Sequence, residues 1–202
     1  MIGRAWRAAG VAILVAAPLP AQVGVRISLG LRYSSDLVRD SIVTPFDVRP
    51  ALAPAASVAL ALPLEKGWTA LATLDGSRST LHRVDATGSV ALQQLTTLAF
   101  TVGFERPIIP RLSGEVGLGG VRYSPSAETG VFKDGNPSIA GLVLVQVNYA
   151  PPLPGPFRRC ALSLRYDLHQ FITTALRAEG FQDSRAVHRF TLGVTAALGA
   201  AP

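Results

Sequence analysis

Apolar and polar side chains alternate at every second position over long stretches of the chain. Between residues 23 and 34 the two sets are Val23, Val25, Ile27, Leu29, Leu31 and Tyr33 against Gly24, Arg26, Ser28, Gly30, Arg32 and Ser34. Successive side chains of a β-strand point to opposite faces, so this segment predicts a strand with one apolar face and one small or polar face. An α-helix needs apolar residues three and four apart, and that spacing is missing here.

The same alternation recurs and predicts eight strands in all. The other segments are 55–64, 68–74, 90–105, 112–123, 138–149, 159–169 and 189–198. Phe46 and Val48 carry the alternation upstream of the second strand, where Pro50 favours a hairpin that projects beyond the membrane. In the fifth segment the phase slips at Gly119 and Gly120, which predicts a β-bulge. Strands of about ten residues are long enough to cross hydrocarbon when tilted.

The predicted connections between these strands are alternately short and long. Segments 65–67, 107–110 and 151–156 are short and hold glycine or proline, whereas segments 35–47, 76–88, 124–136 and 173–186 are long. We expect turn tips at Thr87-Gly88 and Asp134-Gly135. Short turns at one rim and long outer loops at the other are typical of outer-membrane barrels. The sequence therefore predicts an all-β fold, an eight-stranded antiparallel up-and-down transmembrane β-barrel with both chain ends in the periplasm.

The composition of the polar face indicates which face is outside. A soluble barrel of the lipocalin kind would also alternate, but its water-facing side should be rich in lysine, glutamate and other long polar groups. Here that face holds mostly glycine, alanine, serine and threonine, with single charged residues between them. Small residues suit the cramped interior of an eight-stranded barrel. We therefore favour a membrane barrel with its leucines and valines toward lipid, and keep a soluble periplasmic carrier as an alternative.

The first 21 residues have the features of a secretory signal peptide. Arg4 and Arg7 form a short positive region, residues 8–15 are apolar, and Leu19-Pro20-Ala21 ends the segment with a small residue. The apolar run is too short for a membrane-spanning helix, which needs about 20 residues. We expect cleavage after Ala21, a barrel domain over residues 22–202, and export to the outer membrane of a Gram-negative-type bacterium.

Charge and ligand-forming residues exclude several other classes of protein. The net charge is +6, but the arginines are scattered singly, so no nucleic-acid partner is expected. Cys160 is the single cysteine, which rules out an internal disulfide. The three histidines, His82, His169 and His188, do not have the spacing of a compact metal site. We expect neither a metal nor a cofactor.

Charged residues on the small-residue face are predicted to form an interior polar network of ion pairs, because an unpaired charge in a narrow interior is costly. Its predicted members are Arg26, Arg32, Glu115, Arg159, Arg165, Asp167, His169 and Arg189. Within this set, Asp167 and His169 share a face near the outer rim, with His188 and Arg189 on the next strand. An acid–base pair of this kind suits ester hydrolysis, so an enzyme that modifies outer-leaflet lipid stays an alternative.

Aromatic residues fall near the expected edges of the membrane, where their amphipathic rings are favoured. The predicted aromatic girdle consists of Tyr33, Trp68, Phe104, Tyr123, Tyr149, Phe157, Phe171 and Phe190. Four of these residues adjoin the short turns and four adjoin the long loops.

The segments Leu118–Tyr123 and Leu164–Asp167 resemble strands of the small outer-membrane barrel proteins, the OmpA-like, OmpX-like and OmpW-like group. The resemblance implies a structural, surface-interaction or small-solute (porin-like) role in the cell envelope. It also implies outer-membrane lipid, lipopolysaccharide and the outer-membrane assembly machinery as partners, with no oligomeric state indicated. Gln170 and Phe171 follow His169, so the chain lacks the His-x-Ser-Asn pattern of lipid A deacylases. We expect no enzymatic activity.

Overall fold

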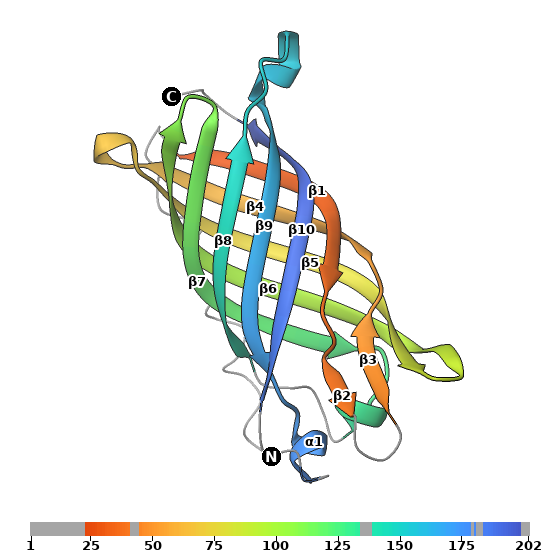
Figure 1. The fold of residues 1–202 in the computed structure, drawn as a ribbon. Helices are drawn as coiled ribbons and strands as arrows, with labels where there is room; N and C mark the ends of the chain where they lie inside the picture. The colour runs from red at the N-terminus through yellow and green to blue at the C-terminus, as the bar shows by residue number, and fades with distance from the viewer. Residues whose placement is uncertain (1–22, 41–44, 134–138, 179, 181–183, 199–202) are drawn as a thin grey trace, which may run out of the picture.

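Eight antiparallel strands close into a barrel in the computed structural model, which describes residues 23–40, 45–133, 139–178, 180 and 184–198 (Figure 1). The predicted signal peptide lies outside the described residues. Pairing of the first barrel strand with the last closes the ring, so every barrel strand has a paired neighbour on each side. The predicted fold class is confirmed. The barrel strands are β1 (Gly24–Ser34), β4 (Ala53–Pro63), β5 (Thr69–Asp85), β6 (Gly88–Ile109), β7 (Leu112–Pro125), β8 (Ala140–Tyr149), β9 (Cys160–Phe171) and β10 (Arg185–Leu198).

The two ends of the barrel differ in their connections. One end, the short-turn rim, holds η2 (Glu65–Gly67), the turn at Pro110-Arg111 and a segment that ends in η4 (Gly155–Arg159). The opposite end, the long-loop rim, lies at the bottom of Figure 1. It carries β2 (Val38–Asp40), β3 (Phe46–Pro50), η3 (Gly130–Phe132) and α1 (Thr174–Ala178). Among the described residues, no helix has the length and apolar character needed to cross a membrane.

The predicted long loop over residues 76–88 is wrong, because both flanking strands continue through it. β5 runs to Asp85 and β6 begins at Gly88, so only Ala86 and Thr87 form the turn, to which the backbone N–H of Thr87 contributes a 2.9 Å hydrogen bond to Asp85. The outer part of β5 pairs with β3 on one side and with β6 on the other. The polar residues of β5 in this part therefore have strand partners on both sides. The resulting hairpin projects from the barrel in Figure 1.

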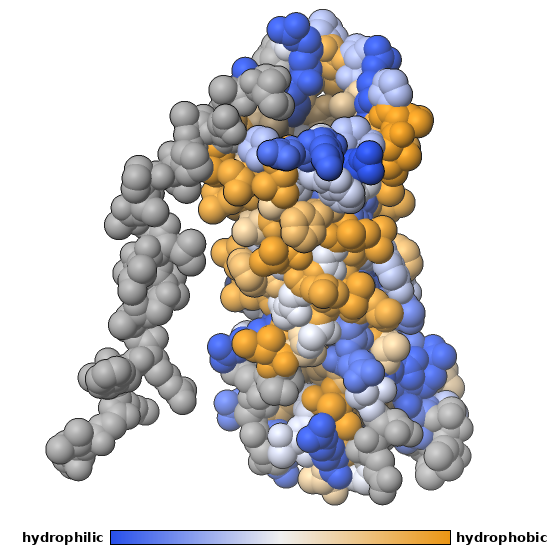
Figure 2. Space-filling view, turned by 90° about the vertical axis from the view of Figure 1, so that its left-hand side faces the viewer, coloured by the Kyte–Doolittle hydropathy of each residue, from blue (hydrophilic) through white to orange (hydrophobic). Residues whose placement is uncertain are grey.

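Apolar side chains point outward around the middle of the barrel, as predicted. Leu29, Leu118 and Leu192 are each about two-thirds exposed, at 65%, 66% and 65%. Figure 2 shows the hydrophobic residues of this face gathered in the middle of the molecule and hydrophilic residues at both ends. This arrangement is the reverse of a soluble carrier, whose leucines would line a cavity. Further outward residues are Val58, Leu60, Leu74, Leu98, Phe100, Val102, Val116, Val143, Val145, Leu162, Leu164 and Val194.

Glycines allow neighbouring strands to approach closely at two seams on opposite sides of the ring. At the β1–β10 seam Gly30 faces Gly193, and a Cβ added to Gly30 would lie 2.4 Å from the carbonyl oxygen of Leu192. At the β6–β7 seam a Cβ on Gly119 would lie 2.0 Å from the carbonyl oxygen of Phe100. Only glycine lets the neighbouring backbones approach this closely. Each half of the ring between the two seams contains four strands.

The β-bulge predicted at Gly119 and Gly120 is also wrong. β7 keeps an unbroken register with both β6 and β8 through these glycines. Irregularities occur instead between Leu81 and His82 and between Pro107 and Ile109. Because β7 keeps its phase, Tyr123 points inward and is 3% exposed.

Candidate functional site

A belt of buried ion pairs crosses the barrel interior. Arg32 and Asp75, from β1 and β5, form a two-pronged pair with N–O distances of 2.7 and 2.6 Å. The Arg32 Nε also donates to the Thr191 hydroxyl at 2.9 Å. Both charged side chains are almost fully buried, and planar two-pronged pairing is the geometry that makes a guanidinium–carboxylate contact strong.

Asp167 is the centre of the belt. Its two carboxylate oxygens accept from Arg165 Nε at 2.7 Å and from Arg189 Nη2 at 2.9 Å. Asp167 is 0% exposed and Arg189 is 1% exposed. Two arginines therefore share one buried acid. Arg189 Nε and Nη1 and Arg165 Nη2 are buried without a hydrogen-bond partner among the described residues.

His169 and Tyr123 form the boundary of the belt on the side of the long-loop rim. The Tyr123 hydroxyl and the His169 Nε2 lie 2.6 Å apart, and Tyr123 also packs edge-on against Phe171. His188 points to the outer face, where its Nδ1 lies 2.8 Å from the Tyr166 hydroxyl. The grouping of His188 with Asp167 and His169 was therefore wrong, because neighbouring positions on β10 face opposite sides of the sheet.

A second polar group lies toward the short-turn rim. Glu105 accepts hydrogen bonds from Arg26, from the Ser113 hydroxyl, and from Asn148 Nδ2 at 3.1 Å. Glu115 faces the same interior and is 5% exposed. The described interior thus holds four arginines (Arg26, Arg32, Arg165, Arg189) and four acids (Asp75, Glu105, Glu115, Asp167), which are equal in number.

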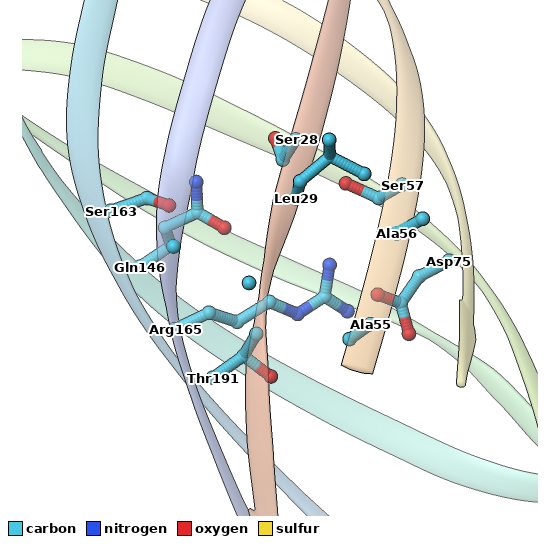
Figure 3. A pocket seen from close by; sticks show the side chains of 12 residues that line it. Ser28, Leu29, Ala55, Ala56, Ser57, Asp75, Gln146, Ser163, Arg165 and Thr191 are labelled. Atoms are coloured by element: carbon cyan, nitrogen blue, oxygen red, sulfur yellow. The ribbon is translucent and has the colours of Figure 1, made fainter. Parts of the chain in front are cut away.

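Two small cavities remain between these groups, each with a volume of about 20 Å³. Such a volume holds about one water molecule. Figure 3 shows one of them, where the Arg165 side chain extends across the interior with its guanidinium toward Asp75. At these two places the belt leaves room for single water molecules rather than for a wide passage.

An apolar core closes the interior between the belt and the long-loop rim. Inward strand residues meet Phe132 of η3 and Leu176 of α1, which the loops place over the barrel. The Thr173 hydroxyl donates to the carbonyl oxygen of Val131 at 2.6 Å and accepts from the backbone N–H of Leu176, so it ties the two loops together. The sequence pattern predicted a polar network in the interior but not this apolar core. The buried core residues are Leu37, Val38, Val48, Leu81, Leu95, Ala99, Val121, Tyr123, Phe132, Leu142, Phe171, Leu176 and Val187.

Most residues of the predicted polar network lie inside the barrel, with one exception. Arg159 is exposed in η4 at the short-turn rim, because β9 begins only at Cys160. Sequence reasoning left out Asp75 as a network member. Asp75 continues the inward positions of Leu71 and Thr73, so the alternation itself could have identified it. The inward predicted residues are Arg26, Arg32, Glu115, Arg165, Asp167, His169 and Arg189.

Two residues of the predicted aromatic girdle are buried instead. Tyr123 and Phe171 are each 3% exposed and pack in the apolar core, because the loops cover the inner face at this level and make it apolar. The other six point outward, and their role at a membrane boundary stays a prediction. They are Tyr33, Trp68, Phe104, Tyr149, Phe157 and Phe190.

The described residues contain no group of three or more histidine, cysteine, aspartate or glutamate side chains arranged to hold a metal ion. His82 lies on the β5–β6 hairpin, where its Nδ1 is 3.2 Å from the Ser89 hydroxyl. His169 is inside the barrel and His188 is outside it. The three histidines therefore occupy separate places.

Comparison with known proteins identifies the fold. No family model and no curated protein sequence matches the chain. Ail of Yersinia pestis in a phospholipid bilayer nanodisc superposes with a TM-score of 0.51 at 12% identity, over 87% of this chain and 99% of Ail. Ail in complex with the heparin analogue sucrose octasulfate gives 0.50 at 13% identity, over 88% and 99%. Neisserial surface protein A gives 0.50 at 13% identity, over 89% and 97%. The chain therefore has the fold of the small bacterial outer-membrane β-barrel proteins.

Proposed function

We propose that this protein is an integral barrel of a bacterial outer membrane that does not conduct solutes and acts through its surface. The outward band of leucine, valine and phenylalanine supports insertion in lipid, because water would disfavour so large an exposed apolar area. The likeness to outer-membrane barrels supports a long-loop rim that faces the outside. Val25 pairs with Leu198 at the short-turn rim, which would then lie on the periplasmic side.

The sealed interior carries this proposal. A solute would have to pass the Arg32–Asp75 pair, the Asp167 centre and the apolar core in turn. Breaking a buried pair leaves an uncompensated charge, which is strongly unfavourable. We therefore prefer a structural or surface-interaction role to the small-solute role.

The hairpins at the long-loop rim are the surface that would meet other molecules outside. Arg39 pairs with Asp36 and Asp47, both at 2.7 Å, and the Arg83 guanidinium lies 4.6 Å from the centre of the Phe46 ring. Each of these arginines has an aspartate within 4 Å, since Arg83 lies 3.7 Å from Asp85. This mixture of charges differs from a purely basic patch, so we do not extend to this chain the heparin analogue named for Ail.

The other proposed partners follow from the membrane location. Outer-membrane lipid would contact the apolar band, and lipopolysaccharide phosphates would meet exposed arginines of the outer face such as Arg122. The outer-membrane assembly machinery would insert the barrel during biogenesis. Because the ring closes within one chain, the barrel does not need a second copy to complete it.

Conductance in planar lipid bilayers tests the sealed interior. We expect purified, refolded protein to give no stable single-channel steps, while a general porin at the same protein-to-lipid ratio gives them. A gel shift between boiled and unboiled samples confirms that the inserted protein is folded. Reproducible open channels from the wild-type barrel would refute the proposal. Release of the protein from cells by osmotic shock without detergent would refute its membrane location.

The burial of Asp167 and His169 supports the absence of lipid-modifying activity. Both side chains are almost fully buried beneath the apolar core, and Tyr123 covers the His169 Nε2. We expect His169→Ala to leave the lipid A profile identical to that of wild-type cells when expression is matched. A profile that changes in a deletion strain, and is restored by the wild type but not by this variant, would establish the enzyme instead.

A further inference from the structure

An arginine and a tryptophan form a cation–π contact on the outer wall of the barrel at the short-turn rim. The Arg106 guanidinium lies 5.4 Å from the centre of the Trp68 ring. Trp68 directly precedes β5, and its neighbour Thr69 pairs with Glu105, so the register places Trp68 beside Arg106. Both side chains are exposed. We infer that this pair binds the phosphate of an anionic phospholipid in the leaflet that surrounds the short-turn rim. The inference rests on the proposed function, because it needs the barrel to span a lipid bilayer.

Arg106 has no counter-charge within the part of the chain that the structure describes. No carboxylate there lies within 4 Å of its guanidinium, and the printed sequence places only Trp68 against it in that part. By contrast, Arg39 and Arg83 at the long-loop rim each have an aspartate partner. A cation–π contact holds the guanidinium in place but offers no oxygen to its N–H groups. Those donors remain available, and a guanidinium binds phosphate through two of them at once.

Apolar side chains lie on both sides of Arg106 along β6. Phe104 and Ile108 are 48% and 62% exposed, and Ile108 extends over Gly114 of the neighbouring β7. The Arg106 guanidinium therefore stands at the end of the outward apolar band. An arginine in such a position turns its charged end toward the polar region of the bilayer, while its methylene groups stay on the apolar surface. A phospholipid with an acyl chain against Phe104 would have its phosphate within reach of this guanidinium.

The exposed charges of the short-turn rim favour an anionic headgroup over a zwitterionic one. Exposed basic residues outnumber exposed acids in the described part of this rim, where Glu65 is the one exposed acid. The basic residues, apart from Arg159, which already has an interaction partner, are Lys66, Arg106, Arg111 and Arg158. Basic residues beside a membrane attract anionic lipids over a distance of about one Debye length. The rim therefore selects a lipid with a net negative headgroup, such as phosphatidylglycerol.

Fluorescence of Trp68 in lipid vesicles tests this inference. Trp6 lies in the predicted signal peptide, so Trp68 is the only tryptophan of residues 22–202. The refolded barrel of these residues is placed in phosphatidylcholine vesicles with brominated phosphatidylglycerol or brominated phosphatidylcholine at the same mole fraction. Bromine quenches tryptophan only at short range, so the extent of quenching reports which lipid lies next to Trp68. We expect a relative binding constant of about fivefold in favour of phosphatidylglycerol at low salt, and a smaller preference at high salt.

Three variants assign the preference to the guanidinium. Arg106→Gln should abolish it, whereas Arg106→Lys should keep most of it because lysine retains the charge. Arg122→Gln is the matched control, since Arg122 is another exposed outward arginine but lies in β7 toward the long-loop rim. We expect this control to keep the wild-type preference. The two brominated lipids are compared within each variant, so a change in the intrinsic emission of Trp68 cancels.

Equal quenching of the wild type by the two brominated lipids would overturn the inference, as would an unchanged preference in Arg106→Gln. Either result leaves the proposed membrane location intact, because Trp68 still contacts lipid. Absence of quenching by both lipids, in protein with folded gel mobility, would overturn the proposed function and the inference with it, since Trp68 would then lie away from hydrocarbon.

Discussion

Gly119→Ala is expected to lower the free energy of unfolding of the barrel by about 3 kcal/mol, through overpacking of backbone against backbone. The added Cβ would lie 2.0 Å from the Phe100 carbonyl oxygen and 2.7 Å from the Thr101 Cα. Neither atom belongs to a flexible side chain, so β6 and β7 must separate and weaken their pairing. Urea titration of the protein in lipid vesicles, followed by the fraction with folded gel mobility, measures the change.

Gly141→Ala provides the control for this experiment. Gly141 lies on the neighbouring β8, where an added Cβ has no heavy atom within 4 Å. We expect its unfolding midpoint to equal or exceed that of the wild type, because alanine restricts the unfolded chain more than glycine does. Similar losses in the two variants would show that the close approach at the β6–β7 seam is not what requires glycine.

Asp167→Asn is expected to destabilise the barrel by about 3–5 kcal/mol, the range for removing one partner of a buried ion pair. The substitution keeps the shape of the side chain but leaves Arg165 and Arg189 buried without their shared counter-charge. The same urea titration measures this loss. The substitution also removes one negative charge from the belt, so it tests the contribution of ion pairing to the interior.

Asp47→Asn is the matched control on the surface. Asp47 pairs with Arg39 at 2.7 Å, a distance equal to that between Arg165 and Asp167, but the Arg39 side chain is 52% exposed. Solvent screens such a pair, so the unfolding midpoint should not move. If Asp167→Asn were as mild as Asp47→Asn, the belt would not be a stabilising element of the interior.

Period-two alternation was sufficient to predict the eight strands and the outward face. Lipid favours apolar side chains on the outer face of a membrane-crossing strand, and the narrow interior favours small or polar ones on the inner face. The alternation therefore repeats along the whole strand. Leu29, Leu162 and Val194 all point outward as the pattern indicated. The pairing of Arg32 with Asp75 could not be predicted. The two residues are 43 positions apart in the chain, and their contact depends on the register of their strands in the barrel.

The errors in the sequence analysis arose where the strands leave the apolar band. Gly120 and Arg122 lie on the outward face of β7, and their small and charged side chains made the phase seem to slip. Tyr123 was then placed on the outside because of its residue type. It lies an even number of positions from Glu115 on the same strand, however, and therefore shares the inward face. The loop residues Phe132 and Leu176 complete the apolar core, and short loop segments carry no periodic signal that would identify them.

The polar residues of segment 76–88 gave a further misleading signal. Serine, threonine and arginine at this density resemble a loop, but β3 and β6 supply backbone partners on both sides of the strand. Pairing therefore overrides composition, as is common for β-strands. The consequence for function is that the β5–β6 hairpin presents a fixed surface at the long-loop rim.

Spin-label accessibility along β10 in lipid vesicles is the most direct test of the central arrangement. In a Cys160→Ser background, single cysteines at Phe190, Leu192 and Val194 alternate with cysteines at Thr191 and Thr195. We expect labels at the first three positions to be relaxed by oxygen, which concentrates in hydrocarbon, and labels at the two threonines to be shielded from it. Relaxation of Leu192 and Val194 by a water-soluble nickel complex, with the threonine positions buried in an apolar core, would contradict the account.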